Sequence, residues 1–147
     1  MPSDAVVDAL VRASFQVMGV LTRIGAEHDL SLTQLRVLGI LRDRRASMTE
    51  LATFLGLDRS TMSGLIDRAE RRGLLARGKN HVDGRVVDVF MTPVGRELAE
   101  RIEAEIRRAL TPAIERLDPQ RRDQLVDLLE PVATSPLTLR QRPAARH

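Results

Sequence analysis

Residues 47–73, SMTELATFLGLDRSTMSGLIDRAERRG, decide the fold of this chain because they encode two helices separated by a tight turn. Ser47 and Glu50 form a capping box, in which each side chain satisfies an amide that the helix start leaves unpaired. Gly56 ends this short helix, and Asp58 caps a second one that Gly73 closes, as glycine often does by adopting a left-handed conformation. The spacing is typical of a helix-turn-helix.

The second helix of this stretch has two chemically different faces. Its apolar residues lie on one stripe at the helical period, and we expect them to pack on the preceding helices. The opposite face is small and polar near its start and basic near its end, so that it can approach base edges in a major groove and reach phosphates. The apolar stripe is Met62, Leu65, Ile66 and Ala69, and the predicted DNA-binding residues are Arg59, Ser60, Thr61, Ser63, Gly64, Arg68 and Arg71. A solvated amphipathic helix would have the same two faces, so this helix alone does not decide the function.

A hairpin follows the helix-turn-helix. Residues 74–77 and 85–91 are two short strands, and the polar stretch between them has a glycine at each end, which predicts a projecting wing. Asp67 lies on the proposed DNA face, where a bare carboxylate would repel phosphates. We therefore expect Asp67 to support the wing by orienting Arg85 toward a minor groove, where narrow A·T-rich tracts attract arginine.

Helices surround this central region on both sides. Residues 4–28 have apolar positions at steps of three and four, over so much of the circumference that the helix needs more than one partner surface. A second helix begins at Ser31 or Thr33, and two more begin at the cap-and-proline pairs 92–93 and 118–119. The predicted fold class is mainly α with a small two-stranded β wing (α+β), a winged helix-turn-helix joined to a helical dimerisation region.

The predicted organisation has four segments. Residues 1–30 form an N-terminal dimerisation helix, 31–92 the winged helix-turn-helix, 93–133 the C-terminal dimerisation helices, and 134–147 a flexible basic tail. The net charge of +3 is distributed unevenly along the chain: it is −1 over residues 1–41, +3 over 42–91, −2 over 92–133 and +3 in the tail. A basic centre flanked by acidic helices favours a nucleic-acid partner.

Several function classes are excluded or disfavoured by composition. The chain has no cysteine and only three scattered histidines, so we expect no disulfide, thiol switch, metal site or cofactor. Neither a catalytic Ser/His/Asp order nor a glycine-rich phosphate loop occurs, and no catalytic residue is predicted. No continuous apolar run reaches the ~18 to 20 residues of a membrane span, and no signal peptide is evident, so we expect a cytoplasmic protein without a membrane partner.

Four stretches together resemble one bacterial family. LTQLRVLGIL at 32–41, MTELATFLGLDRSTMSGLIDRAERRGLLAR at 48–77, VDGRVVDVFMT at 82–92 and PVGREL at 93–98 occur in the order and spacing of MarR-family regulators. The resemblance implies a cytoplasmic homodimer, formed by the first and the last two helices, that binds a palindromic operator in double-stranded DNA. By physics alone, half-sites on one face of the duplex are about 34–36 Å apart.

The resemblance also implies roles for residues. By position, Asp83 and Arg85 match the wing motif of the family, and Thr33 and Gln34 match a phosphate-facing helix start. Members of the family usually repress transcription, and many release DNA when a small aromatic or anionic effector binds. Two departures reduce the number of reading groups here: Gly84 replaces a second wing arginine, and Gly64 offers no side chain to a base.

Two alternatives stay open on the sequence alone. Arg12, Phe15 and Met18 on the first helix could line an effector cavity, or Phe15 and Met18 could belong to a dimer core with Arg12 on the surface. The winged helix could also serve protein–protein assembly without specific DNA binding, since a fold does not fix a function. Salt-dependent retention on DNA separates this module from a regulator.

Overall fold

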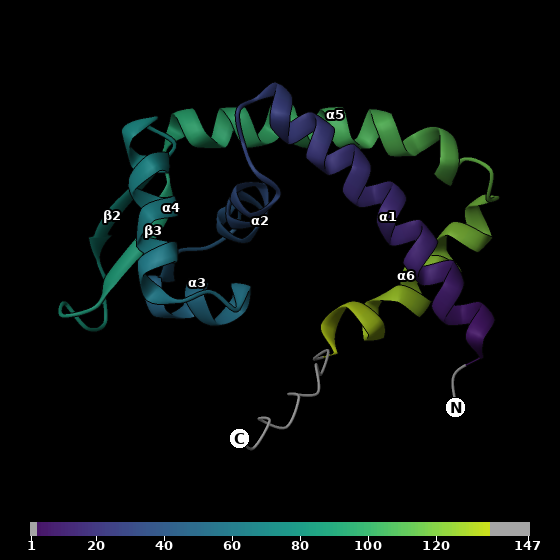
Figure 1. Ribbon diagram of the computed structural model, residues 1–147, viewed down its shortest axis with the longest axis horizontal. Helices are drawn as coiled ribbons and strands as arrows, with labels where there is room; N and C mark the ends of the chain where they lie inside the picture. Colours follow the sequence, from purple (N-terminus) through teal and green to yellow (C-terminus); the bar gives the residue numbers. More distant parts are fainter. Residues whose placement is uncertain (1–2, 136–147) are drawn as a thin grey trace, which may run out of the picture. The chain divides into compact units, whose positions relative to one another are not determined.

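The computed structural model describes residues 3–135 and confirms the predicted fold class. Most of this region is helical, with a small antiparallel sheet (Figure 1). In chain order the elements are α1 (Asp4–Glu27), α2 (Leu32–Leu41), β1 (Ala46–Ser47), α3 (Met48–Leu55), α4 (Arg59–Arg71), β2 (Leu75–Lys79), β3 (Val87–Met91), α5 (Pro93–Ile114) and α6 (Pro119–Thr134). From residue 136 onward, the tail predicted for 134–147 lies outside the described residues.

The chain divides into two compact units. The first, up to Leu110, contains α1–α4, the sheet and most of α5, and the second begins at Thr111 and contains α6. In the second unit, the Asp118 side chain caps α6 by accepting the Arg121 N–H at 2.9 Å, as the cap-and-proline pair predicted. The functional features described below lie in the first unit.

The sheet has three strands rather than the two expected. Its order is β1-β3-β2, all antiparallel, with Ala46 opposite Val89 and Leu75 opposite Met91. The additional strand β1 is only two residues long, too short to show the alternation by which strands are recognised in a sequence. Ser47 ends β1 and also caps α3, so the sheet edge fixes where the helix-turn-helix starts.

The helix-turn-helix is built on the apolar stripe that the sequence predicted. Met62 and Ile66 of α4 are completely buried, together with Leu51 of α3. The turn between the helices needs Gly56, whose φ of +64° places it in the left-handed region. Asp58 then caps α4 by accepting the Thr61 N–H at 2.7 Å. One face of α4 is therefore fixed in the core, and its other face is left to solvent.

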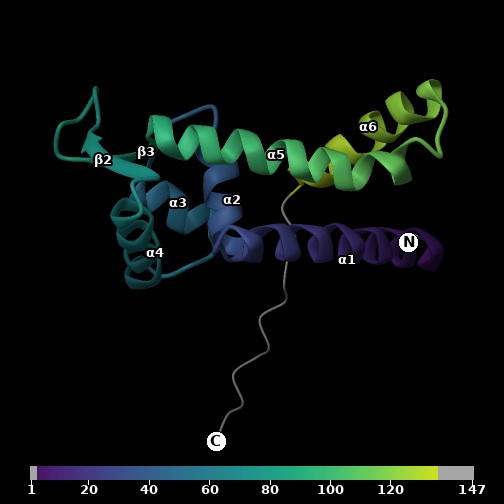
Figure 2. The ribbon, with the colours of Figure 1, turned by 90° about the horizontal axis from the view of Figure 1, so that it is seen from above.

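Helices α1 and α5 flank α2 (Figure 2). At the end of α1, Gly25 is buried against α2, where a β-carbon would lie 2.6 Å from the Leu30 carbonyl oxygen and 3.0 Å from Leu35. Only glycine allows this close approach. The rest of α1 is mostly exposed, and within the described residues it is the one helix that is long and apolar enough, by length and composition, to cross a membrane. A helix whose exposed apolar surface packs against a partner chain has the same apolar composition as a helix that crosses a membrane.

Gly95 in the first turn of α5 provides a test of how tightly this helix docks on the sheet. A β-carbon there would overlap the Leu74 carbonyl and lie 3.0 Å from Met91, so Gly95→Ala must displace backbone. We expect this substitution to lower the free energy of unfolding by about 1–3 kcal/mol, as overpacking does. Gly39→Ala is the matched control, because nothing lies within 4 Å of its β-carbon. Urea denaturation that shows the same loss for both variants would contradict the close packing.

Candidate nucleic-acid interface

The outward face of α4 holds the polar residues that the sequence assigned to it. Arg59, Ser60, Thr61, Asp67, Arg68 and Arg71 are exposed, whereas Ser63 and Gly64 are partly buried. The Ser60 hydroxyl donates to Asp58 Oδ1 at 2.9 Å, so its single proton is committed and its oxygen is left to accept a hydrogen bond. The backbone N–H of Thr61, followed by this hydroxyl, lowers the pKa of Asp58 and keeps the cap charged. The start of α4 is therefore a fixed structure.

A hollow of about 400 Å³ joins α4 to the start of α3 and to the wing. Its lining includes three arginines and no acidic residue, so every charged side chain that lines it is a cation. Arg59 forms no ion pair with any other described residue. The lining residues are Ser47, Met48, Thr49, Arg59, Ser63, Arg77, Arg85, Val86 and Val87. Thr49 and Arg77 were not predicted, because their place here depends on how α3 and β2 fold against α4.

Asp67 supports the wing, but through a different arginine from the one expected. Its carboxylate pairs with Arg77 of β2, and Arg77 Nε also lies 2.7 Å from Glu70 Oε1 one turn further along α4. Arg77 has this role because β2 leaves the end of α4 directly and runs beside it, whereas Arg85 lies beyond the loop of the hairpin. Asp67 and Glu70 of α4 therefore hold the base of the wing through ion pairs with Arg77.

Arg85 is oriented within the wing itself. Asp83 Oδ1 accepts the backbone N–H of Arg85 at 3.1 Å and its Nε at 3.2 Å. The backbone bond, followed by the side-chain bond, lowers the pKa of Asp83 and holds it as a carboxylate. The Arg85 side chain is 92% exposed, so the guanidinium projects from the protein and is free to contact another molecule.

A buried network that the sequence did not reveal shapes the wing loop. Asp88 is only 5% exposed, and both of its carboxylate oxygens accept from the Asn80 amide, at 3.1 and 3.2 Å, while Arg45 lies at 3.5 Å. The side-chain oxygen Oδ1 of Asn80 in turn accepts the N–H groups of Val82 and Asp83. This local pattern is typical of asparagine in turns, which is the signal that could have identified it.

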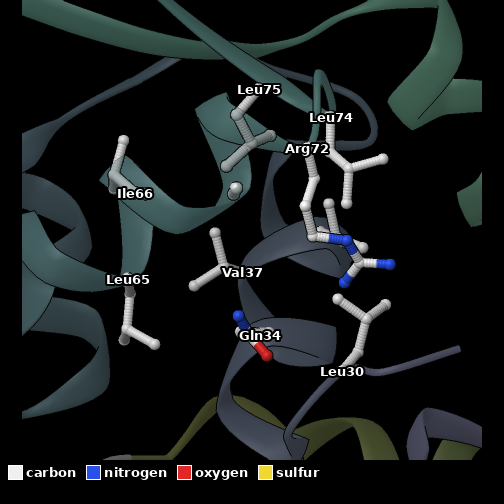
Figure 3. Close-up of a pocket in the computed structure, with 10 residues that line it drawn as sticks. Leu30, Gln34, Val37, Leu65, Ile66, Arg72, Leu74 and Leu75 are labelled. Carbon is white, nitrogen blue, oxygen red and sulfur yellow. The ribbon is translucent and has the colours of Figure 1, made fainter.

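Thr33 and Gln34 do not join the hollow. The Gln34 side chain is used in the capping box of α2, where its Oε1 accepts the Ser31 N–H at 2.8 Å. Figure 3 shows Gln34 among apolar side chains around a cavity of about 10 Å³ between α2, α4 and Leu30. Thr33 is partly buried at the start of α2. Their assignment to a phosphate stays a prediction.

A second, apolar groove of about 460 Å³ lies between α1, α2 and α5. Met18 lines it, as proposed for an effector site, but Arg12 and Phe15 do not: Arg12 bonds to the Asp8 carbonyl, and Phe15 is 67% exposed. The apolar walls are Met18, Leu21, Leu32, Leu35, Leu38, Ala99, Ile102 and Ile106. No cluster of three metal-ligating side chains occurs in residues 3–135.

The polar rim of this groove is an ion pair. Arg42 Nη1 lies 3.0 Å from Glu103 Oε2 of α5, and Arg36 of α2 also lines the groove while its Nη2 donates to the Phe54 carbonyl at 3.5 Å. Hydrogen bonds to Asp43 and then to Glu103 raise the pKa of Arg42, so the rim keeps its positive charge. The sequence did not predict these arginines for the groove, because the crossing of α2 and α5 brings them there.

Comparison with known proteins agrees with this architecture. The family model described as "MarR family" matches residues 28–86, which span the winged helix-turn-helix to the wing. The homoprotocatechuate degradative operon repressor of Escherichia coli is 28% identical over 128 residues, covering 86% of each chain.

Solved structures show the same arrangement. BpsR of Bordetella bronchiseptica, whose DNA binding is regulated by 6-hydroxynicotinic acid, is 28% identical with a TM-score of 0.70, over 92% of this chain and 98% of its own. CouR of Rhodococcus jostii RHA1, bound to p-coumaroyl-CoA, is 25% identical with a TM-score of 0.76, over 92% and 96%.

A double-mutant cycle tests which arginine Asp67 holds. Arg77 and Asp67 side chains are 34% and 52% exposed, so solvent weakens their attraction. For Asp67→Ala combined with Arg77→Ala, we expect a coupling in the free energy of unfolding of about 0.2–1 kcal/mol, as for exposed pairs. For Asp67→Ala combined with Arg85→Ala we expect additivity. Coupling in the second cycle but not in the first would restore the Asp67–Arg85 pair.

Proposed function

Because this chain belongs to the MarR family of transcriptional regulators, we propose that it is a repressor that binds a palindromic operator as a homodimer and is released by an amphipathic anion. The observation that carries the proposal is the basic hollow where α4, the start of α3 and the wing meet. Members of this family are regulators rather than enzymes. The domain division proposed from the sequence follows from the same reading: DNA binding in residues 31–92 and dimerisation in 1–30 and 93–133.

The polar face of α4 fits a major groove. Ser60, Ser63 and Gly64 are small, so the helix backbone can approach the base edges, and the Ser60 oxygen can accept from an exocyclic amine of adenine or cytosine. Arg68 and Arg71, nearer the end of the helix, are placed to meet phosphates. In the same docking the exposed Arg85 extends toward the adjacent minor groove.

The exposed apolar surface supports a homodimer. Helix α1 of the first unit and helix α6 of the second each expose large hydrophobic side chains, and exposed apolar patches of this kind mark protein–protein contact sites. On α1 these are Val6, Val7, Leu10, Val11, Phe15, Val17 and Met18, and on α6 they are Leu125, Val126, Leu128, Leu129 and Val132. A symmetric dimer buries such a patch against its own copy and presents two recognition helices to a palindrome. This dimer would act in the cytoplasm.

The groove between α1, α2 and α5 supports an effector with an apolar body and an anionic group. Leucine and isoleucine side chains would hold the body, and Arg36 and Arg42 would meet the charge. An anion competes with Glu103 for Arg42, and it would thereby loosen the tie between α2 and α5. BpsR and CouR, which respond to or bind 6-hydroxynicotinic acid and p-coumaroyl-CoA, have ligands of this general chemistry.

Selection of bound fragments from genomic DNA tests the regulator proposal. We expect an inverted repeat with half-site centres about 34–36 Å apart, and a binding constant that falls steeply with salt, with a log–log slope of about −0.9 for each phosphate neutralised. Arg68→Ala should reduce this slope by about 0.9, because Arg68 is proposed to meet a phosphate.

The control for DNA selection is Arg44→Ala, because Arg44 packs over the Phe54 ring and lies outside both the hollow and the helices proposed for the dimer. This variant should bind the selected operator as the wild type does. Retention of no fragment even at low salt would overturn the proposal in favour of the protein-assembly alternative.

Thermal unfolding with matched ligands tests the effector class. Aromatic carboxylates such as 6-hydroxynicotinate and p-coumarate should raise Tm, because a ligand that binds only the folded state stabilises it, by about 2.7 kcal/mol at a hundredfold excess over Kd. The corresponding neutral amides should have little effect, since they do not attract Arg36 and Arg42. Arg42→Gln should abolish the difference between acid and amide.

Arg12→Gln serves as the matched control for Arg42→Gln, because Arg12 is an exposed arginine outside the groove. It should leave the preference for acids unchanged. Equal stabilisation by acids and amides in the wild type would remove the anion from the proposal.

A further inference from the structure

Arg72 joins the end of the recognition helix to the end of α1. It is the C-cap residue of α4, and its guanidinium donates to two successive carbonyls just after α1: Nη1 to Asp29 at 2.9 Å and Nη2 to His28 at 2.8 Å. Figure 3 shows the side chain extending from α4 toward Leu30. The carbonyls at a helix end carry partial negative charge, which a cation there stabilises.

The corner that Arg72 grips has a single well-defined conformation. Asp29 has a φ of +55°, the one positive value among the described non-glycine residues, and L residues rarely adopt it without support. The Leu30 N–H bonds to the Gly25 carbonyl at 2.8 Å, and Gly25 leaves no space for a β-carbon against α2. Leu30 is buried. The corner therefore cannot move independently of α2 or of the guanidinium that holds it.

His28 connects the same corner to α5. Its carbonyl accepts from Arg72, while its ring Nε2 lies 3.0 Å from Glu105 Oε2. Glu105 lies one residue before Ile106, which lines the apolar groove, and Leu21 of α1 lines the groove two turns before His28. The two walls of the groove and the end of α4 are thus tied to one corner of the chain.

We propose that Arg72 is a positioning residue that sets the orientation of the recognition helix relative to α1. The inference rests on the proposed function, in which α1 belongs to the dimer interface and α4 enters the DNA. If α1 is fixed to its copy in the dimer, the bond from Arg72 to the corner determines how far apart the two copies of α4 stand. Arg72 then contributes to operator spacing without touching DNA.

The geometry requires a guanidinium rather than any cation. Two nitrogens of one planar group reach two neighbouring carbonyls at once, a fork that the single ammonium of lysine cannot reproduce. Arg72→Lys therefore keeps the positive charge but loses the paired bonds to the His28 and Asp29 carbonyls, which we call the joint. Arg71→Lys is the matched control for the exchange measurement, because Arg71 is the neighbouring arginine of α4 and makes neither of the two bonds to the corner.

The first measurement is made on the free protein, without DNA. Hydrogen exchange of the amides at 28–30 and in the last turn of α4 should become faster in Arg72→Lys than in the wild type, and it should be unchanged in Arg71→Lys. Unchanged exchange in Arg72→Lys would show that the bonds do not hold the joint, and it would overturn the proposal whether or not the chain binds DNA.

The second measurement uses the operator recovered by selection and the same operator with one base pair inserted between its half-sites. Arg72→Lys should bind the natural spacing about tenfold more weakly than the wild type, a common size for coupling between sites, with an unchanged salt slope. The penalty for the inserted base pair should shrink, because the two recognition helices are no longer held at a fixed separation.

The outcomes separate this inference from the function on which it rests. A wild type that binds no operator contradicts the proposed function, while the exchange measurement still decides the joint. A wild-type protein that binds, with an Arg72→Lys variant of equal affinity and equal spacing preference, overturns the role of Arg72. A salt slope lowered by about 0.9 in Arg72→Gln would instead make Arg72 a phosphate contact. If Arg72→Lys only reduced the amount of folded protein, the fraction that still folds would prefer the natural operator spacing as strongly as the wild type does. That result would also contradict a positioning role.

Discussion

The burial of one face of α4 is the constraint on which the rest of this structure depends. Met62 and Ile66 have no exposed surface, so the helix cannot rotate about its axis without opening the core. Its remaining freedoms are to slide and to tilt, and polar contacts restrict both. Asp58 caps the start, Arg77 grips Asp67 and Glu70 on the side, and Arg72 holds the end. A helix that reads DNA needs this rigidity, because recognition depends on where its outward face stands.

Most of the fold could be predicted from the sequence because it is written in local signals. The caps Ser47 and Asp58 and the left-handed glycines 56 and 73 act within a few residues of where they occur, and the structure places the helix ends there. The apolar stripe of α4 was predictable for the same reason, since its period is local. Strand β1 was not, because a two-residue strand exists only through its pairing with β3. The sequence therefore predicts well those features that depend on interactions between residues close together in the chain.

The candidate site was harder to predict, because it is assembled from parts that meet only in three dimensions. Asp67 needed a cation, and the charge argument was sound, but choosing Arg85 over Arg77 required knowing that β2 runs beside α4 while the wing loop leads away from it. Gln34 was assigned to a phosphate by position, yet the capping box at Ser31 uses its side chain. Arg42 lines the apolar groove only because α2 and α5 cross there. In each case the residue type indicated the kind of interaction, but the sequence did not show which group would be the partner.

The different roles of the arginines support the proposal that this chain, despite its modest net charge, binds DNA. Between residues 42 and 91, Arg42, Arg45, Arg72 and Arg77 are engaged with carboxylates or carbonyls of the protein itself, where they fix helices and strands in place. Arg59, Arg68 and Arg71 form no ion pair within residues 3–135, and Arg85 is held by Asp83 yet remains almost fully exposed. Arg42, Arg45 and Arg77 offset part of the acidic charge, and the exposed arginines are left as a small set directed outward. Affinity then depends less on net charge than on how rigidly these few cations are presented, because phosphate contacts position a protein on DNA only when their geometry matches the duplex.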